Sequence, residues 1–335
     1  MNSHYRPLWT YLKRSMTAIW VLLCLGCAHQ FALPEEPRPA IYTVVTTSDS
    51  LIRQWAPAFV AHGYADEYNR IGRPTADGVP EHADEVWIDT ARPTVYFLRR
   101  TFTTEKATYT NLIYRVHFPK VPYSLTPFNL TAGDNGGLIV VVTLDADNRP
   151  LLVTTVHTCG CYKAFVPTDL IPAGLRPEGW DVSQIQSVYG ERLPSQLNYN
   201  GLEDPVLIVD LRPGVHRVMS LAVVPARQIT NDRYIPIAMT VEPMAALEQL
   251  PSPQGTTSFY YDQGWREGHV KGSIKPFEMI FLSLISLDLF VGSDKDYADP
   301  AITDNPFYTS LKPWRRHDSD MWDFARFLHY WGWRF

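Results

Sequence analysis

A short run of imidazole and thiol side chains, His157-Thr158-Cys159-Gly160-Cys161, is the part of this chain whose residue types and spacing could do chemistry. It follows a predicted strand, in which alternate side chains point to the same face. If that strand continues, His157, Cys159 and Cys161 lie in one row. Such a row offers one borderline and two soft ligands, which zinc or Cu(I) accepts.

A tetrahedral metal site needs a fourth ligand from elsewhere in the chain. His117, at the end of one predicted strand, and His216, at the start of another, are the candidates, because neighbouring strands bring sequence-distant side chains together. The pattern therefore predicts a structural or metal-holding centre, with zinc or copper as the candidate cofactor.

Redox chemistry is the alternative use of Cys159 and Cys161. Residues two apart in a strand lie ~6.6 Å apart, close to the ~6.8 Å upper limit for a disulfide, so the chain would have to bend at Gly160. A disulfide closing so short a loop adds little stability and is easily reduced. The alternative function is thus a thiol-based oxidoreductase, or a metal-dependent enzyme, in which His157 lowers a cysteine pKa. A third interpretation is two buried structural thiols, with His157 bonded at the strand end.

Common catalytic signatures are absent from the sequence. It contains no GxSxG nucleophile elbow, HExxH zinc helix, phosphate-binding Walker loop or GxGxxG dinucleotide fingerprint. The sequence therefore leaves open whether the protein is an enzyme.

Residues 1–26 have the layout of a secretory signal peptide. Arg6, Lys13 and Arg14 precede an apolar run from Met16 to Leu25. That run is about half of the ~20 residues that a membrane-spanning helix needs. The segment therefore indicates export rather than a permanent transmembrane anchor.

The end of this leader, Leu25-Gly26-Cys27, resembles the lipobox of bacterial lipoproteins, although Cys24 and Leu25 depart from its usual residues. The resemblance covers the leader alone. It implies lipidation of Cys27, by palmitate among other acyl groups, and attachment to the membrane through this lipid. The implied location is the bacterial cell envelope, on the outer membrane facing the periplasm, with another envelope protein as a candidate partner. Cleavage after Ala28 would instead give a soluble periplasmic protein.

Residues 27–40 read as a tether between the leader and the folded body. Pro34, Pro37 and Pro39 prevent a helix or a central strand there. Loss of the three basic leader residues would take the formal charge from −5 to −8. An acidic body has no electrostatic reason to bind nucleic acid, so no nucleic-acid partner is expected.

Residues 41–335 are expected to form a single β-rich α+β domain. Three pairs of segments rich in β-branched and aromatic residues predict serial hairpins, which favour an antiparallel sheet or sandwich. The run Ile139–Val142 is apolar on both faces and predicts a central strand. The predicted hairpins are Val95–Phe102 with Tyr109–Phe118, Gly137–Leu144 with Leu151–His157, and Val206–Leu211 with Val215–Val224.

The last part of the chain, from about residue 270 to 335, is expected to be helical and packed on the sheet. Phe277–Val291 is apolar on nearly every side, which predicts a buried helix. A final helix is expected to start at Asp318 or Ser319. Its sheet-facing side would carry Met321, Phe324, Ala325, Leu328 and Trp331.

Overall fold

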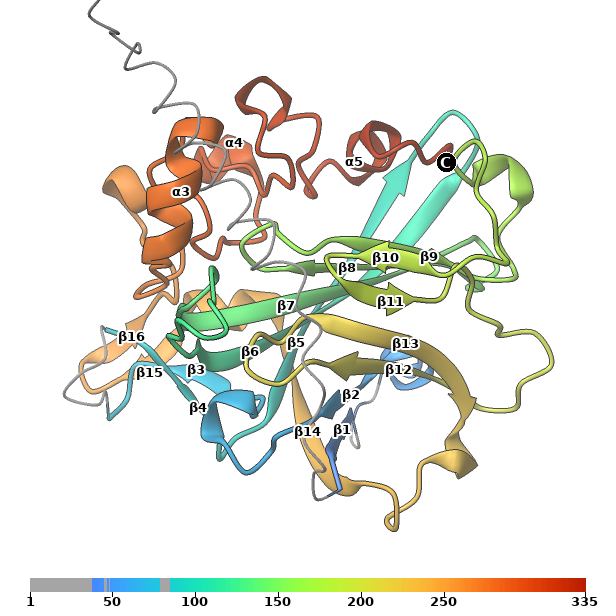
Figure 1. Ribbon diagram of the computed structural model, residues 1–335, viewed down its shortest axis with the longest axis horizontal. Helices are drawn as coiled ribbons and strands as arrows, with labels where there is room; N and C mark the ends of the chain where they lie inside the picture. The colour runs from blue at the N-terminus through green and yellow to red at the C-terminus, as the bar shows by residue number, and fades with distance from the viewer. Residues whose placement is uncertain (1–37, 45–46, 48, 79–84) are drawn as a thin grey trace, which may run out of the picture.

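A ten-stranded mixed sheet forms the body of the protein (Figure 1). The computed structural model describes residues 38–44, 47, 49–78 and 85–335. The signal peptide, the lipidation of Cys27 and most of the tether were predicted on residues outside these ranges. In sheet order the strands are β13 (Val218–Pro225), β12 (Pro205–Leu211), β2 (Ala58–Ala61), β1 (Ala40–Val44), β14 (Ile235–Pro243), β5 (Thr94–Thr103), β6 (Thr108–Val121), β7 (Gly133–Leu144), β8 (Pro150–His157) and β9 (Ala164–Pro167).

The three predicted hairpins are confirmed. β5 pairs with β6, β7 with β8 and β12 with β13, each in antiparallel register. The turns that join them hold the polar and glycine residues that turns require. The β-rich α+β class is likewise confirmed.

The sheet is mixed rather than purely antiparallel, which corrects the expected architecture. β14 lies between β1 and β5 and runs parallel to both, and β12 runs parallel to β2. These pairings join strands far apart in the sequence, so no hairpin pattern could predict them. They connect the N-terminal strands to the middle of the chain.

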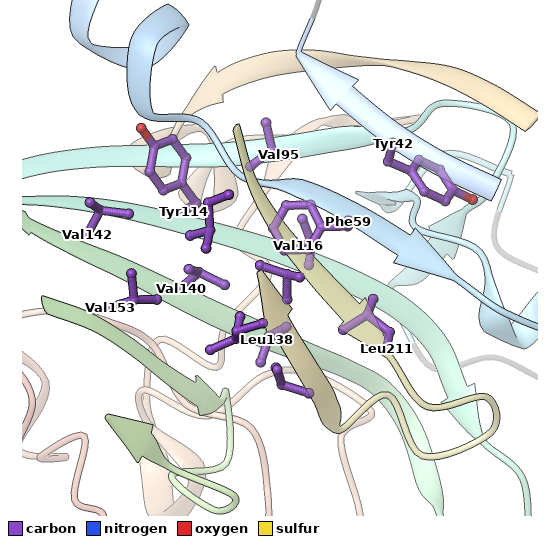
Figure 2. Packing of buried hydrophobic residues seen from close by; sticks show 14 of the residues in the cluster. Tyr42, Phe59, Val95, Tyr114, Val116, Leu138, Val140, Val142, Val153 and Leu211 are labelled. Carbon is purple, nitrogen blue, oxygen red and sulfur yellow. The ribbon is translucent and has the colours of Figure 1, made fainter. Parts of the chain in front are cut away.

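The sheet curls so that its two halves enclose one apolar core. Phe59 of β2 and Leu211 of β12 belong to the same buried cluster as Tyr114 of β6 and Val153 of β8. Figure 2 shows side chains from both halves of the sheet converging in this space. Strands remote in the sheet order therefore face each other across the core.

Strand β7 is buried on both of its faces, as the apolar run Ile139–Val142 predicted. Val140 and Val142 point into the enclosed core, whereas Ile139 and Val141 point into a second cluster on the opposite face. All four side chains are at most 1% exposed. The strand is therefore covered from both sides.

The last helix, α5 (Phe324–Tyr330), helps to cover this second face. Its Phe324 packs on Phe102 of β5, and Phe327 packs on Phe165 of β9. The predicted docking on the sheet is correct, but the helix begins later than expected. Asp323 caps it by accepting a hydrogen bond from the backbone N–H of Arg326.

The expectation of a buried helix over Phe277–Val291 was wrong. Helix α3 spans Pro276–Ser286 and lies at a corner of the molecule (Figure 1). It buries Glu278 and Ser286 and exposes aliphatic side chains. Exposed in and just after it are Ile280 (67%), Leu284 (85%), Ile285 (53%), Leu287 (71%) and Leu289 (62%).

Shorter elements complete the fold. The two-stranded sheets are β3 (Arg73–Thr75) with β4 (Trp87–Asp89), β10 (Gln186–Val188) with β11 (Glu191–Leu193), and β15 (Leu250–Ser252) with β16 (Gly255–Thr257). Among the described residues, the remaining α-helices are α2 (Ser50–Trp55) and α4 (Pro300–Thr303). The 3-10 turns are Glu67–Asn69, Ala173–Leu175, Ala226–Gln228, Met244–Glu248, Gly264–Arg266 and Pro313–Arg315. Within the described ranges, no helix has the length and apolar character needed to cross a bilayer.

A matched pair of leucine substitutions tests the contrast between β7 and α3. Leu138→Ala removes a fully buried side chain and should lower the free energy of unfolding by about 2–5 kcal/mol. Leu284→Ala removes a side chain that is 85% exposed and should change it by less than about 0.5 kcal/mol. Urea denaturation of both variants measures the difference, and a loss above about 2 kcal/mol in Leu284→Ala would contradict the orientation of α3.

Candidate functional site

The chain turns sharply directly after β8, within the segment that the sequence marked for chemistry. The backbone N–H of Gly160 donates to the carbonyl of His157 at 2.7 Å, and that of His157 donates to the carbonyl of Cys161 at 3.0 Å. Gly160 has φ +90°, and a Cβ there would lie 2.1 Å from the carbonyl oxygen of Tyr308. Only glycine fits this position without a shift of the backbone.

The turn contradicts the expected row of side chains but contains the expected bend at Gly160. β8 ends at His157, so His157, Cys159 and Cys161 do not form a row on one strand face. The bend at Gly160 nevertheless brings the two cysteines together. Both are free thiols; Cys159 is buried and Cys161 is partly exposed.

The two thiols meet a carboxyl group from a distant part of the chain. The Sγ atoms of Cys159 and Cys161 and a carboxylate oxygen of Glu278 all lie within 4.8 Å of one another. The Sγ atom of Cys161 lies 4.0 Å from Glu278 Oε1. Two soft ligands and one hard ligand therefore converge on one point.

Glu278 is held inside the protein by the first turn of α3. Its side chain is 2% exposed, and its Oε2 atom has no hydrogen-bond partner among the residues that the structure describes. Gly292, with φ +85°, leaves the space that this carboxyl group fills, since a Cβ there would lie 1.9 Å from Oε2. A buried oxygen without a partner is costly to a folded protein, so this carboxyl group calls for a functional explanation.

Two buried lysines border the group. Lys275 Nζ pairs with Asp294 Oδ1 at 3.1 Å. Lys295 Nζ donates to the carbonyl oxygens of Cys159 at 3.0 Å and Ser293 at 3.3 Å. Both ammonium groups are thus occupied by partners within the protein, while their charge still acts on the thiols.

The proton affinities of the three groups differ from their ordinary values. A hydrogen bond from Cys161 lowers the pKa of Cys159 to about 6, with help from the charge of Lys275. The same bond, together with burial, raises the pKa of Cys161. Burial raises the pKa of Glu278 to about 8, and the Cys159 charge adds to the rise. Without a further cation, the site therefore limits its own negative charge by keeping protons on Cys161 and Glu278.

A cavity of about 220 Å³ opens onto the three side chains. Its walls come from α3, from the loop before β7, from the segment after α3 and from the stretch around Tyr308. The site is therefore reachable by a small molecule.

The predicted histidines lie outside this three-residue group. The His157 ring contacts the carbonyl oxygen of His216 at 3.2 Å, and the His216 ring stacks on Phe118. His117 Nε2 accepts a hydrogen bond from Arg115 Nε at 3.1 Å. Burial lowers the pKa of all three imidazoles, and for His216 it does so to about 3. Metal ligation by these histidines stays a prediction from the sequence.

Glu278 is the site residue that the sequence did not identify. It lies 117 positions from Cys161, and no motif links the two. One signal was present: a carboxylate within an otherwise apolar segment needs a partner or a function. Which partner it meets is decided by the tertiary structure.

Comparison with protein-family models, curated proteins and solved structures gave no match. The function is therefore argued from the geometry of the site.

The pH dependence of stability tests the buried state of Glu278. With a pKa of about 8 when folded and 4.5 ordinarily, the folded protein holds a proton that the unfolded chain releases between these values. Its stabilising contribution is complete below about pH 4.5 and is lost as the pH rises through about 8. Glu278→Gln stays neutral. In metal-free protein, the original protein should therefore lose stability between about pH 5 and 8 and Glu278→Gln should not. The free energy of unfolding of Glu278→Gln minus that of the original protein should rise over this range by up to a few kcal/mol.

Urea denaturation in the presence of a chelator measures this difference. Glu105→Gln removes an exposed carboxylate in the β5–β6 turn and controls for the loss of one negative charge. Parallel pH profiles for the original protein and Glu278→Gln would show that Glu278 is not buried as described.

Proposed function

We propose that this protein is a lipid-anchored protein of the bacterial cell envelope that holds a divalent metal ion, zinc by preference, through Cys159, Cys161 and Glu278. The observation that carries the metal centre is the convergence of the Sγ atoms of Cys159 and Cys161 and a carboxylate oxygen of the buried Glu278 within 4.8 Å of one another. A metal ion bound there would offset the cost of burying this carboxyl group. Thiolates and a carboxylate are a ligand set that zinc accepts.

The distances support this assignment. With Zn–S near 2.3 Å and Zn–O near 2.1 Å, tetrahedral geometry places a sulfur and an oxygen ligand about 3.6 Å apart. The Sγ of Cys161 lies 4.0 Å from Glu278 Oε1, and the whole group lies within 4.8 Å. Side-chain movements on the order of 1 Å would close the group around an ion.

The formal charges also favour a dication. Two thiolates, Glu278 and Asp294 carry four negative charges, and Lys275 and Lys295 carry two positive charges. The difference of two negative charges is what a divalent ion neutralises. Metal binding would thus release the protons held by Cys161 and Glu278.

Three protein ligands would leave one tetrahedral position open, and all three residues line the cavity. Structural zinc sites use four protein ligands, whereas catalytic sites use three and keep a position for water or substrate. The arrangement favours a centre that acts on, or binds, a small molecule over a purely structural one.

A thiol oxidoreductase is the second candidate function. The observation that favours it is the closeness of two free thiols, one of which has a pKa lowered to about 6. Oxidation would join the two sulfur atoms and pass two electrons and two protons to an acceptor of the disulfide class. The same sulfur atoms cannot hold the metal in that state.

Cobalt titration tests the metal centre. In the full chain carrying Cys24→Ser and Cys27→Ser, one equivalent of Co²⁺ should produce thiolate charge-transfer absorption, and Zn²⁺ should displace it. Cys159→Ser, Cys161→Ser and Glu278→Gln should each weaken the affinity by at least about 100-fold, because each removes a direct ligand.

His157→Gln is the comparison variant for this titration. It tests the sequence-based prediction of histidine ligation and should bind Co²⁺ as the original protein does. An equal loss of affinity in His157→Gln would show that His157 is the fourth metal ligand. No coordination position would then remain for a small molecule. Absence of charge-transfer absorption in the original protein would overturn the metal centre and leave thiol redox chemistry as the better candidate.

Lipid attachment rests on the lipobox-like leader and is tested separately. Cys27→Ser should abolish labelling by radioactive palmitate and release the protein from membranes in cell fractionation, because it removes the acylated thiol. Cys24→Ser is the matched control and should retain both labelling and membrane association. Unchanged labelling in Cys27→Ser would contradict the anchor.

A further inference from the structure

The wall of the cavity above the metal site is apolar. Aliphatic side chains line it from three segments: Leu130 before β7, Leu282 of α3, and Leu311 between α4 and α5. Tyr162, Tyr189 and Tyr308 supply aromatic surface. Among the described residues that line the cavity there is no lysine, arginine, histidine or aspartate, and Glu278 is the one carboxyl group.

The two buried lysines that border the thiols offer no attachment point for a charged molecule in the cavity. Lys275 is 3% exposed and paired with Asp294, and Lys295 is fully buried. The Lys295 ammonium lies 4.4 Å from the centre of the Tyr308 ring, and the same ring faces the cavity. Lys163 stacks on Trp331, Arg217 on Tyr162 and Arg316 on Tyr308, and none of these three cations lines the cavity. A phosphate or carboxylate group entering the cavity would therefore lose its hydration without gaining an ion pair with a side chain of the lining.

The size of the cavity limits the molecule that fits. A volume of about 220 Å³ corresponds to roughly seven water volumes of ~30 Å³ each. It therefore accommodates a body of a few carbon atoms beyond the group that meets the metal. Both wall chemistry and volume fit a small uncharged molecule better than a nucleotide, a sugar phosphate or a peptide.

We infer that the open position of the metal centre receives a neutral molecule with one donor atom and a short apolar body, which packs against Leu130, Leu282 and Leu311. This inference rests on the proposed metal centre for the donor atom, and on the cavity alone for the apolar body. The apolar wall acts by removing hydrocarbon from water, so affinity should grow with each methylene that the cavity can hold.

A homologous series of neutral ligands tests it. In the Co²⁺-loaded full chain carrying Cys24→Ser and Cys27→Ser, 1-methyl-, 1-propyl- and 1-hexylimidazole should shift the cobalt spectrum. Affinity should rise about fourfold per methylene, and the rise should level off once the cavity is full. An imidazole bearing a short carboxylate chain should bind at least about tenfold more weakly than the neutral analogue of equal length.

Two variants of α3 provide the matched comparison. Leu282→Ser places a hydroxyl group in the cavity wall and should reduce the gain per methylene to below about twofold. Leu284→Ser alters a side chain that is 85% exposed on the same helix and should leave the series unchanged. A flat series in the original protein, or equal binding of the charged analogue, would overturn the inference.

A metal-free measurement separates this inference from the metal centre. Neutral N-alkylmaleimides should modify the Cys159 and Cys161 pair faster as the alkyl chain lengthens, and a carboxylate-bearing maleimide should be slower than all of them. If cobalt does not bind but this order holds, the metal centre fails and the apolar site stands. If cobalt binds but neither series depends on chain length, the apolar site fails and the metal centre stands.

Discussion

The burial of β7 on both faces is the constraint on which the rest of this structure depends. A strand with Ile139, Val140, Val141 and Val142 in succession carries apolar side chains on both faces, so both faces must be buried. One side is satisfied by the curl of the sheet, which brings β2 and β12 over it. The other side needs the aromatic cluster that includes α5. Much of the chain is therefore folded around this strand.

The same strand fixes the candidate site. The carbonyl oxygen of Gly137 in β7 accepts the backbone N–H of Thr158 at 3.0 Å, which anchors the start of the cysteine turn. The backbone N–H of Lys295 donates to the carbonyl of Thr158 at 2.9 Å, so the segment after α3 is tied to the turn as well. Cys159, Cys161 and Glu278 thus converge on a rigid frame, as a ligand set requires for tight binding.

Helix α3 packs inward through both aromatic and polar side chains, since Phe277 and Phe281 contact Phe128 while Glu278 and Ser286 are buried. Glu278 points toward the thiols, and Arg316 donates to the carbonyl oxygens of Ser286 and Leu287 at the end of the helix. A cation at this end also complements the helix dipole. With these groups turned inward, Ile280 and Leu284 face solvent. The inward position of Glu278 is therefore accompanied by an unfavourable exposure of aliphatic side chains to water.

The sequence by itself determined the six strands of the three hairpins and their pairing, because residue alternation and turn chemistry act over a few positions. It marked Cys159 and Cys161 and the bend at Gly160 for the same reason. Tertiary structure alone decided the parallel pairing of β14, the outward face of α3 and the meeting of Glu278 with the thiols. Each of these depends on contacts between segments far apart in the chain, whose energies no local pattern records. The apolar composition of Phe277–Val291 predicted a hydrophobic helix but not its orientation. The burial of Glu278 goes with the observed orientation, in which aliphatic side chains face solvent.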